Sequence, residues 1–395
     1  MINLLSENKW KTLIAENEHR NVSVLALEWS KKADFPLQII LNQVKGRQIA
    51  KSKLPSWYQN SQIIYPDSIA LEQCSGEIAA KYKASLFSGN RLLDLTGGLG
   101  VDSWAFSKQF ASSIYNEINE ERFVVAKHNL EALNCKNIAF YNQKAEELIQ
   151  DHSIGIFDVI YIDPSRRIEG KRAFRLADLE PNILELRNSL LKKSKVVVIK
   201  AAPMLDIHEA MKDLEGVEKI IVISVKNECK ELLLILSNNQ ITTPKISCVE
   251  LHDKATSIFD FNYEEEASLP LKTGPILDYL YDPYASLTKA GAFKTLTERF
   301  DMNCIHPNSH LYTSTSENLT FPGRMFKVTA VRSFQINELK NDYKQRKATM
   351  VFRNFSTTPD EVMKKLKLKS SEKDYLFFTT DHQNKKVVIV TERIH

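Results

Sequence analysis

The residues best suited to hold a ligand lie in one short stretch, residues 91–102. The stretch is Arg-Leu-Leu-Asp-Leu-Thr-Gly-Gly-Leu-Gly-Val-Asp, and its polar and glycine positions of interest are Asp94, Thr96, Gly97, Gly98 and Gly100. Apolar residues typical of a strand precede the glycines, and a helix-like segment follows them. Glycine lets the backbone turn sharply and approach a ligand without an intervening Cβ. We therefore expect a strand, a ligand-holding glycine turn and a helix.

The glycine spacing decides which ligands are excluded. A dinucleotide fingerprint requires Gly-x-Gly-x-x-Gly, and a phosphate loop requires a lysine with Ser or Thr after its last glycine. The pattern here is Asp-x-Thr-Gly-Gly-x-Gly with no lysine after it, so it fits neither. Taken alone, the motif is also compatible with a simple tight turn in another α/β domain.

Three further apolar segments end in polar residues at regular intervals. They cover residues 113–115, 138–141 and 157–162 and lead into Glu117, Gln143–Glu146 and Asp163, in that order. An acid at the tip of the second strand of such a sheet can accept hydrogen bonds from ribose hydroxyls. An ordered series of strand ends favours one nucleoside-like ligand over an accidental glycine turn.

This ordered set resembles the class I S-adenosylmethionine-dependent methyltransferases. The resemblance implies a Rossmann-like seven-stranded α/β sheet closed by an antiparallel last strand. It also implies cofactor binding by the glycine stretch with Asp94 and Thr96, by Glu117 at the ribose, and by Ala145 packed on adenine. Gln73 and Ser75 precede the first strand, where the family contacts the methionine end of the cofactor; solvated helix positions are the alternative.

Relatives that methylate base nitrogens carry Asp or Asn, two prolines and an aromatic residue at the fourth strand end. Here the residues are Asp163-Pro164-Ser165-Arg166. The acid and the following carbonyl can still accept an amine, but the stacking ring is absent. The planar guanidinium of Arg166 can stack on a base or clamp a phosphate. Alternatively, it pairs with local acids such as Glu169.

No cysteine follows the fourth or fifth predicted strand, which disfavours covalent methylation of a base carbon. Direct in-line attack on the sulfonium methyl needs only positioning and proton acceptance. We therefore predict Asp163, Pro164 and Arg166 as the catalytic residues. Lys200 ends the fifth strand and either faces the same site or serves in charge pairing.

Composition suggests a cytoplasmic protein without a membrane association. The 395 residues carry a net charge of +4, and they contain no long apolar run and no N-terminal signal-peptide pattern. Five cysteines lie far apart without a Cys-x-x-Cys pair, so we expect reduced thiols, no disulfides and no zinc. His306 and His310 flank Pro307 and are expected in a loop, not at a metal site.

We expect five segments along the chain. These are an N-terminal helical segment (1–62), the methyltransferase domain (63–240), a β extension (241–273), a segment covering 274–323 and a basic domain (324–395). Trp10, Trp29 and Trp57 are expected in the core of the first segment. A single helix is predicted over Asp67–Phe87, with Lys81 and Lys83 on its surface.

Positive charge is concentrated at the C-terminal end. Residues 324–395 contain 16 Lys or Arg and 8 Asp or Glu, a net charge of +8, whereas the whole chain carries +4. Strand-like and helix-like runs alternate there, which predicts a small α/β domain. Lys344–Lys347 and Lys364–Lys369 are the basic patches expected to bind a phosphate backbone. An ordinary lysine-rich surface is the alternative.

A closer resemblance rests on the order of several motifs. After the glycine motif come Asp163–Arg167, Asn227–Glu231, Pro283–Phe293, His306–His310 and the basic tail. This order resembles a bacterial methyltransferase family with a ferredoxin-like segment followed by a THUMP-like domain. The resemblance implies an RNA substrate, tRNA or rRNA.

These observations predict a cytoplasmic S-adenosylmethionine-dependent methyltransferase that modifies a base nitrogen in RNA. The alternatives are a protein or small-molecule methyltransferase, or an RNA-binding protein that holds the cofactor without turnover. The sequence indicates no particular oligomeric state.

Overall fold

The computed structural model describes residues 2–5, 7–30, 35–166, 175–239, 243–343 and 347–394, without the side chains of residues 3, 4 and 166. The chain divides into two compact units, Met1–Glu218 with Leu232–Ile241, and Lys219–Glu231 with Thr242–His395. The N-terminal helices are α1 (Ile2–Leu5), α2 (Asn8–Asn17), α3 (Val22–Ser30), α4 (Leu37–Lys53) and α5 (Pro55–Tyr58). Trp10 and Trp29 pack on the core of these helices, as predicted. Trp57 is also buried, but its ring lies 6.2 Å from that of Trp104, outside the N-terminal segment.

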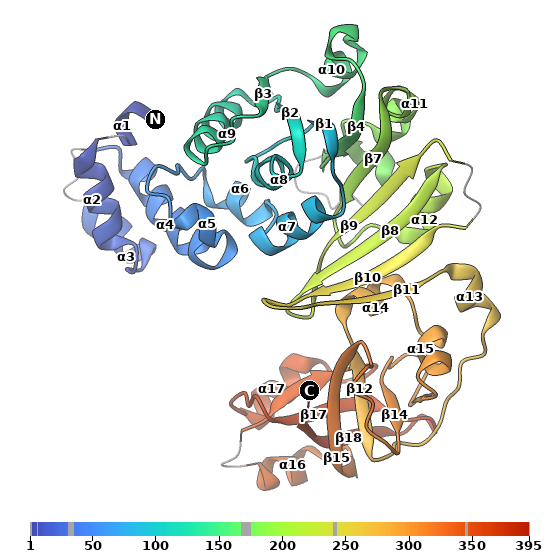
Figure 1. Ribbon diagram of the computed structural model, residues 1–395. Coiled ribbons are helices and arrows are strands. Elements are labelled where there is room, and N and C mark those ends of the chain that lie inside the picture. The colour runs from blue at the N-terminus through green and yellow to red at the C-terminus, as the bar shows by residue number, and fades with distance from the viewer. Residues whose placement is uncertain are drawn as a thin grey trace. The chain divides into compact units, whose positions relative to one another are not determined.

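The predicted methyltransferase sheet is present. Its strands are β1 (Gly89–Asp94), β2 (Phe110–Asn116), β3 (Ile138–Tyr141), β4 (Phe157–Ile162), β7 (Ser194–Ala201), β8 (Val217–Val225) and β9 (Glu228–Ser237). Their order is β3-β2-β1-β4-β7-β9-β8 (Figure 1). The first five strands pair in parallel, and β9 is antiparallel to β7. This is the seven-stranded arrangement with an antiparallel last strand that the sequence predicted.

Helices alternate with these strands, and short loops place the carboxyl ends of neighbouring parallel strands at one edge. The helices are α6 (Ser68–Gln73), α7 (Glu77–Ser85), α8 (Val101–Phe106), α9 (Glu120–Ala132), α10 (Ala145–Gln150), α11 (Ile183–Lys193) and α12 (Ile207–Asp213). β5 (Ser165–Arg166) and β6 (Leu179–Glu180) form a separate small antiparallel pair. The edge where β1, β2, β4 and β7 end therefore collects Thr96, Glu117, Asp163 and Lys200.

The prediction of a single helix over Asp67–Phe87 is wrong. Two helices, α6 and α7, are interrupted between Cys74 and Gly76. The backbone at Cys74 is extended, and Gly76 is the residue before α7. The interruption turns Ser75 into the interior, where its hydroxyl donates to Asp102 at 2.9 Å. A buried polar contact has therefore overridden the helical periodicity.

The same sheet continues past the seven predicted strands to a total of nine, because β10 (Lys245–Leu251) pairs in parallel with β8 and β11 (Thr256–Phe261) pairs with β10. Asn227 in the β8–β9 turn has a positive φ of 60°, which suits a tight hairpin. The backbone N–H of Asn227 donates to Glu250 Oε1 at 2.7 Å, and the side-chain oxygen of Asn227 accepts the backbone N–H of Ala285 at 2.8 Å. Within the described residues, the Asn227 motif thus joins a hairpin tip to a strand and a helix.

The second unit contains a seven-stranded sheet of order β13-β14-β12-β15-β18-β17-β16. Its strands are β12 (Tyr279–Pro283), β13 (Asn303–Cys304), β14 (Tyr312–Ser314), β15 (Gly323–Ser333), β16 (Thr349–Phe352), β17 (Asp374–Thr380) and β18 (Lys386–Arg393). Along β17, Phe377 lies in one buried cluster and its neighbours Leu376 and Phe378 lie in another. Because side chains alternate along a strand, both faces of this part of the sheet are covered.

The helices of this unit are α13 (Tyr263–Ser268), α14 (Ala285–Ala290), α15 (Lys294–Arg299), α16 (Ile336–Asp342) and α17 (Pro359–Leu366). α16 and α17 contribute Leu339, Val362 and Leu366 to the second cluster. No helix in the described part of the chain is long and apolar enough to span a bilayer.

Candidate functional site

The glycine turn connects β1 to α8 and requires glycine for two different reasons. A Cβ at Gly97 would lie 2.1 Å from the ring of Tyr115, so the packing there admits no side chain. Gly98 has a φ of 55°, and a Cβ there would meet nothing within 4 Å. The Tyr115 hydroxyl donates to the carbonyl of Gly98 at 2.6 Å. The turn is thus fixed by Tyr115 on one side, and the space that a side chain at Gly98 would occupy is open.

Asp94 lies beneath this turn and is 1% exposed. The Ser103 hydroxyl in α8 donates to its Oδ2, and the Thr96 N–H donates to its Oδ1 at 3.3 Å. Burial raises the pKa of Asp94 to about 7, and the nearby carboxylates of Asp102 and Asp163 add to the rise. Asp94 therefore joins the strand, the turn and the helix, and its predicted cofactor contact stays a prediction.

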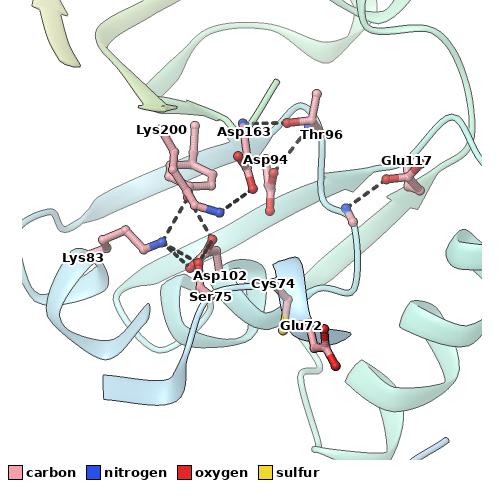
Figure 2. A network of polar contacts seen from close by, with 12 residues as sticks. Glu72, Cys74, Ser75, Lys83, Asp94, Thr96, Asp102, Glu117, Asp163 and Lys200 are labelled. Atoms are coloured by element: carbon pink, nitrogen blue, oxygen red, sulfur yellow. Dashed lines mark hydrogen bonds and ion pairs between the residues drawn. The ribbon is translucent and has the colours of Figure 1, made fainter. Parts of the chain in front are cut away.

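Glu117 lies at the tip of β2, as predicted, and is 7% exposed. Its Oε2 accepts the N–H of Gly98 at 2.9 Å (Figure 2). Its Oε1 accepts the N–H of Asn119 at 2.8 Å. A carboxylate has about four acceptor positions, so two such bonds leave capacity for ribose hydroxyls. The sequence did not predict that Glu117 also holds the glycine turn.

Asp163 follows β4 and is tied to two other strand ends. Its N–H donates to the Thr96 hydroxyl at 2.7 Å, and its Oδ2 accepts the ammonium of Lys200 at 2.6 Å (Figure 2). Pro164 is buried behind it. The backbone of Arg166 pairs with Leu179 in the β5–β6 ribbon, whereas its side chain and residues 167–174 lie outside the described part. The structure therefore brings Thr96, Asp163 and Lys200 together.

A buried charge network lies next to this edge. Lys83 is fully buried, and its ammonium contacts Asp102 Oδ1 at 2.9 Å and the Ser75 hydroxyl at 2.7 Å. Asp102 Oδ2 also accepts the Tyr161 hydroxyl at 2.8 Å. Burial acts to raise the pKa of Asp102, but the charges of Lys83 and then Lys200 hold it below its usual range. The prediction that Lys83 lies on the surface is wrong, because its carboxylate partner is supplied by α8.

The other predicted contact residues lie at element ends. Gln73 ends α6 with an exposed side chain, and Ala145 begins α10 and is buried. Lys81, unlike Lys83, is exposed as predicted and pairs with Glu77. Among the residues that the structure describes, no three His, Cys, Asp or Glu side chains are grouped so as to hold a metal.

The two histidines of the second unit lie in the loop between β13 and β14, as predicted. His306 Nδ1 accepts the N–H of Asn308 at 3.0 Å, and His306 Nε2 lies 3.1 Å from Asn384 Oδ1. His310 stacks on the ring of Phe293 with 3.6 Å between centroids. Both rings therefore stabilise the loop.

Five lysines of the second unit lie around the end of α17. Lys364 and Lys365 lie in its last turn, Lys367 and Lys369 follow, and Lys369 forms a β-bridge with Lys347. All five side chains are exposed, and none forms an ion pair with a described carboxylate. We call these five lysines the basic edge. The other predicted patch largely falls on residues 344–346, outside the described residues.

Family models match most of the chain in three consecutive parts. Residues 77–224 match the family described as conserved hypothetical protein 95. Residues 279–322 match a ferredoxin-like domain, and residues 323–393 match a THUMP domain-like family.

Individual proteins are similar over most of the chain. A crystal structure from Porphyromonas gingivalis W83, provisionally named a methyltransferase, is 31% identical, covers 98% of both chains and has a TM-score of 0.85. Two Mycobacterium tuberculosis strains each have an uncharacterized S-adenosylmethionine-dependent methyltransferase that is 25% identical over 317 residues. That match covers 79% of this chain and 83% of the relative.

Proposed function

Because this chain belongs to the family of S-adenosylmethionine-dependent methyltransferases that carry ferredoxin-like and THUMP-like domains, we propose that it methylates a base nitrogen in RNA. The observation that carries the proposal is the carboxyl edge of the sheet, where Asp163 joins the glycine turn. tRNA and rRNA are the expected substrates, and the cytoplasm is the expected location.

The residues at this edge fit S-adenosylmethionine, which supplies an electrophilic methyl group on a sulfonium. Open space above Gly98 leaves room for the amino-acid part of the cofactor along the turn. The remaining acceptor positions of Glu117 suit the ribose, and Ala145 suits packing against the adenine. The buried carboxyl of Asp94, when ionised, favours a cationic group nearby.

Asp163 is the residue we assign to the acceptor nitrogen. Its side chain is 38% exposed, so a substrate can reach it, and a carboxylate accepts an N–H of an exocyclic amine. Orienting the nitrogen lone pair toward the methyl carbon is the main contribution that such a site can make to direct transfer. The C–N bond forms as the C–S bond breaks, and the nitrogen then loses one proton, which the Asp163 carboxylate can accept.

RNA as the substrate is supported by the THUMP-like match and by the basic edge. Exposed lysines that pair with no described carboxylate attract a phosphate backbone, and counterions are released when it binds. Affinity for tRNA should fall linearly in a plot of log binding constant against log salt concentration. Replacing Lys364, Lys365 and Lys367 by Gln should make the slope of that plot shallower by about one for each lysine. Lys373→Gln is the matched control, since Lys373 already pairs with Glu392 at 3.0 Å.

The decisive assay is transfer of tritium from labelled cofactor into total RNA, followed by nucleoside analysis. Wild-type protein should label RNA, and Asp163→Ala should lower the rate of labelling by about a hundredfold or more, to a small residual rate, while retaining affinity for S-adenosylhomocysteine. Label in protein or small molecules but not in RNA would refute the RNA substrate. Cofactor binding without label in any fraction would refute the enzymatic role.

A further inference from the structure

Two lysine–aspartate pairs connect the same two strands, one at each end. Lys195 near the start of β7 pairs with Asp158 in β4 at 2.7 Å, and Lys200 near the end of β7 pairs with Asp163 at 2.6 Å. The Lys195 side chain is 76% exposed, whereas the Lys200 side chain is only 11% exposed. The Lys195–Asp158 pair already joins the two strands, so the Lys200–Asp163 pair is not needed for that purpose. The second pair lies at the edge that carries the proposed chemistry.

The carboxylate of Asp163 is held in an asymmetric way. Its Oδ2 binds Lys200, and its Oδ1 accepts no hydrogen bond from the described residues. The Thr96 hydroxyl fixes the backbone N–H of the same residue at 2.7 Å. The terminal torsion of an aspartate is broad and roughly two-fold, so without a partner its oxygens exchange places freely. Lys200 removes that freedom.

Lys200 is itself restricted by burial. It is 9% exposed as a whole residue, its side chain is 11% exposed, and its charge also acts on the buried Asp102. A largely buried ammonium has little freedom to follow a more exposed carboxylate into solvent. The position of Asp163 Oδ1 is therefore set by the protein before a substrate arrives.

We propose that Lys200 is a positioning residue for methyl transfer, which holds Oδ2 of Asp163 so that Oδ1 alone receives the N–H of the acceptor nitrogen. This inference rests on the proposed function of Asp163. Lys200 need not contact substrate or cofactor. Its effect is on the orientation of the acceptor, so it should change the rate of transfer more than the affinity for either ligand.

The test compares Lys200→Met, Lys200→Arg and the matched control Lys195→Met in the tritium-transfer assay. We expect Lys200→Met to lower kcat by about tenfold to a hundredfold, with the KM for the cofactor within about twofold of wild type. Lys200→Arg should recover part of the loss because it keeps a cationic donor. Lys195→Met should match wild type. Thermal unfolding and calorimetry with S-adenosylhomocysteine verify that each variant is folded.

Coupling to Asp163 separates positioning from a general structural effect. In an Asp163→Ala background, adding Lys200→Met should cause no further loss of the residual rate, because the group being positioned is gone. Independent losses that multiply would overturn the inference, as would wild-type kcat in Lys200→Met.

A second readout keeps the inference testable if RNA is not the substrate. Crystals of wild type and Lys200→Met with S-adenosylhomocysteine should show the Asp163 carboxylate in one orientation in wild type and rotated or split in the variant. An unchanged single orientation would overturn the inference. Wild-type protein that labels no RNA, with a rotated carboxylate in the variant, would refute the proposed substrate and leave the role of Lys200 supported.

Discussion

Replacing Asp94 by Asn should change how the stability of the protein depends on pH. The buried carboxyl has its pKa raised from 3.8 to about 7, mainly by burial. Asn has nearly the same shape and can keep both contacts, since its oxygen can accept the Thr96 N–H and its amide can donate to the Ser103 hydroxyl. The substitution therefore removes the titration and leaves little unsatisfied.

Stability should fall with rising pH, because the folded state binds the proton of Asp94 more tightly than the unfolded state. The pKa of Asp94 is higher in the folded protein than in the unfolded chain, so its favourable contribution is complete below about pH 4 and is lost as the pH rises to about 7. A rise of about 3 units, at about 1.4 kcal/mol per unit, corresponds to about 4 kcal/mol in all. Above pH 7 the contribution should no longer change.

The assay is urea unfolding of wild type and Asp94→Asn at several pH values from 5 to 8. The unfolding free energy of wild type, relative to that of Asp94→Asn, should fall by about 1.4 kcal/mol for each pH unit up to pH 7 and then stay constant. Asp158→Asn is the matched control, because Lys195 and two backbone N–H groups lower the pKa of Asp158 to about 2, so its titration is complete below pH 5 and its effect on stability should not vary between pH 5 and 8. A difference between wild type and Asp94→Asn that does not vary with pH would refute the reasoning.

Three further predictions concern the same edge of the sheet. Gly97→Ala should prevent stable folding, since its Cβ would lie 2.1 Å from a tyrosine ring. Gly98→Ala should fold, although its positive φ should cost about 1–3 kcal/mol of stability. Calorimetry should show that Gly98→Ala has lost affinity for S-adenosylhomocysteine. Lys83→Met should lower the unfolding free energy by about 3–5 kcal/mol in urea by leaving a buried carboxylate unpaired, while the exposed Lys81→Met should change it by less than about 1 kcal/mol. Binding of cationic S-adenosylmethionine should strengthen as the pH rises from 6 to 8, because it favours ionised Asp94; an equal pH dependence in Asp94→Asn would contradict this.

Local sequence patterns were sufficient to predict the elements that carry the edge. Largely apolar runs such as Phe157–Ile162, in which Asp158 is the one charged residue, predict buried parallel strands, and the glycine turn after Asp94 marks where the first of them ends. The positions of Glu117 and Asp163 follow, because parallel strands end at one edge. These predictions depend only on residues close together in the chain.

What the sequence did not reveal depends on partners that are distant in the chain. Lys83 resembles any surface lysine until α8 brings Asp102 to it, and the same network turns Ser75 inward and interrupts the predicted helix. The pairing of Lys200 with Asp163 joins residues 37 positions apart. A sequence pattern records residue type and local spacing, and neither specifies which buried charge meets which.

The β8–β9 turn has a consequence for how this protein can be divided. The N–H of Asn227 and the hydroxyl of Ser224 both donate to Glu250, and the Asn227 side chain accepts from Ala285. A chain cut after residue 240 would retain the donors at the hairpin tip and lose all of these partners. Shortened versions that keep β10, β11 and α14 should therefore be the smallest that preserve an intact catalytic half.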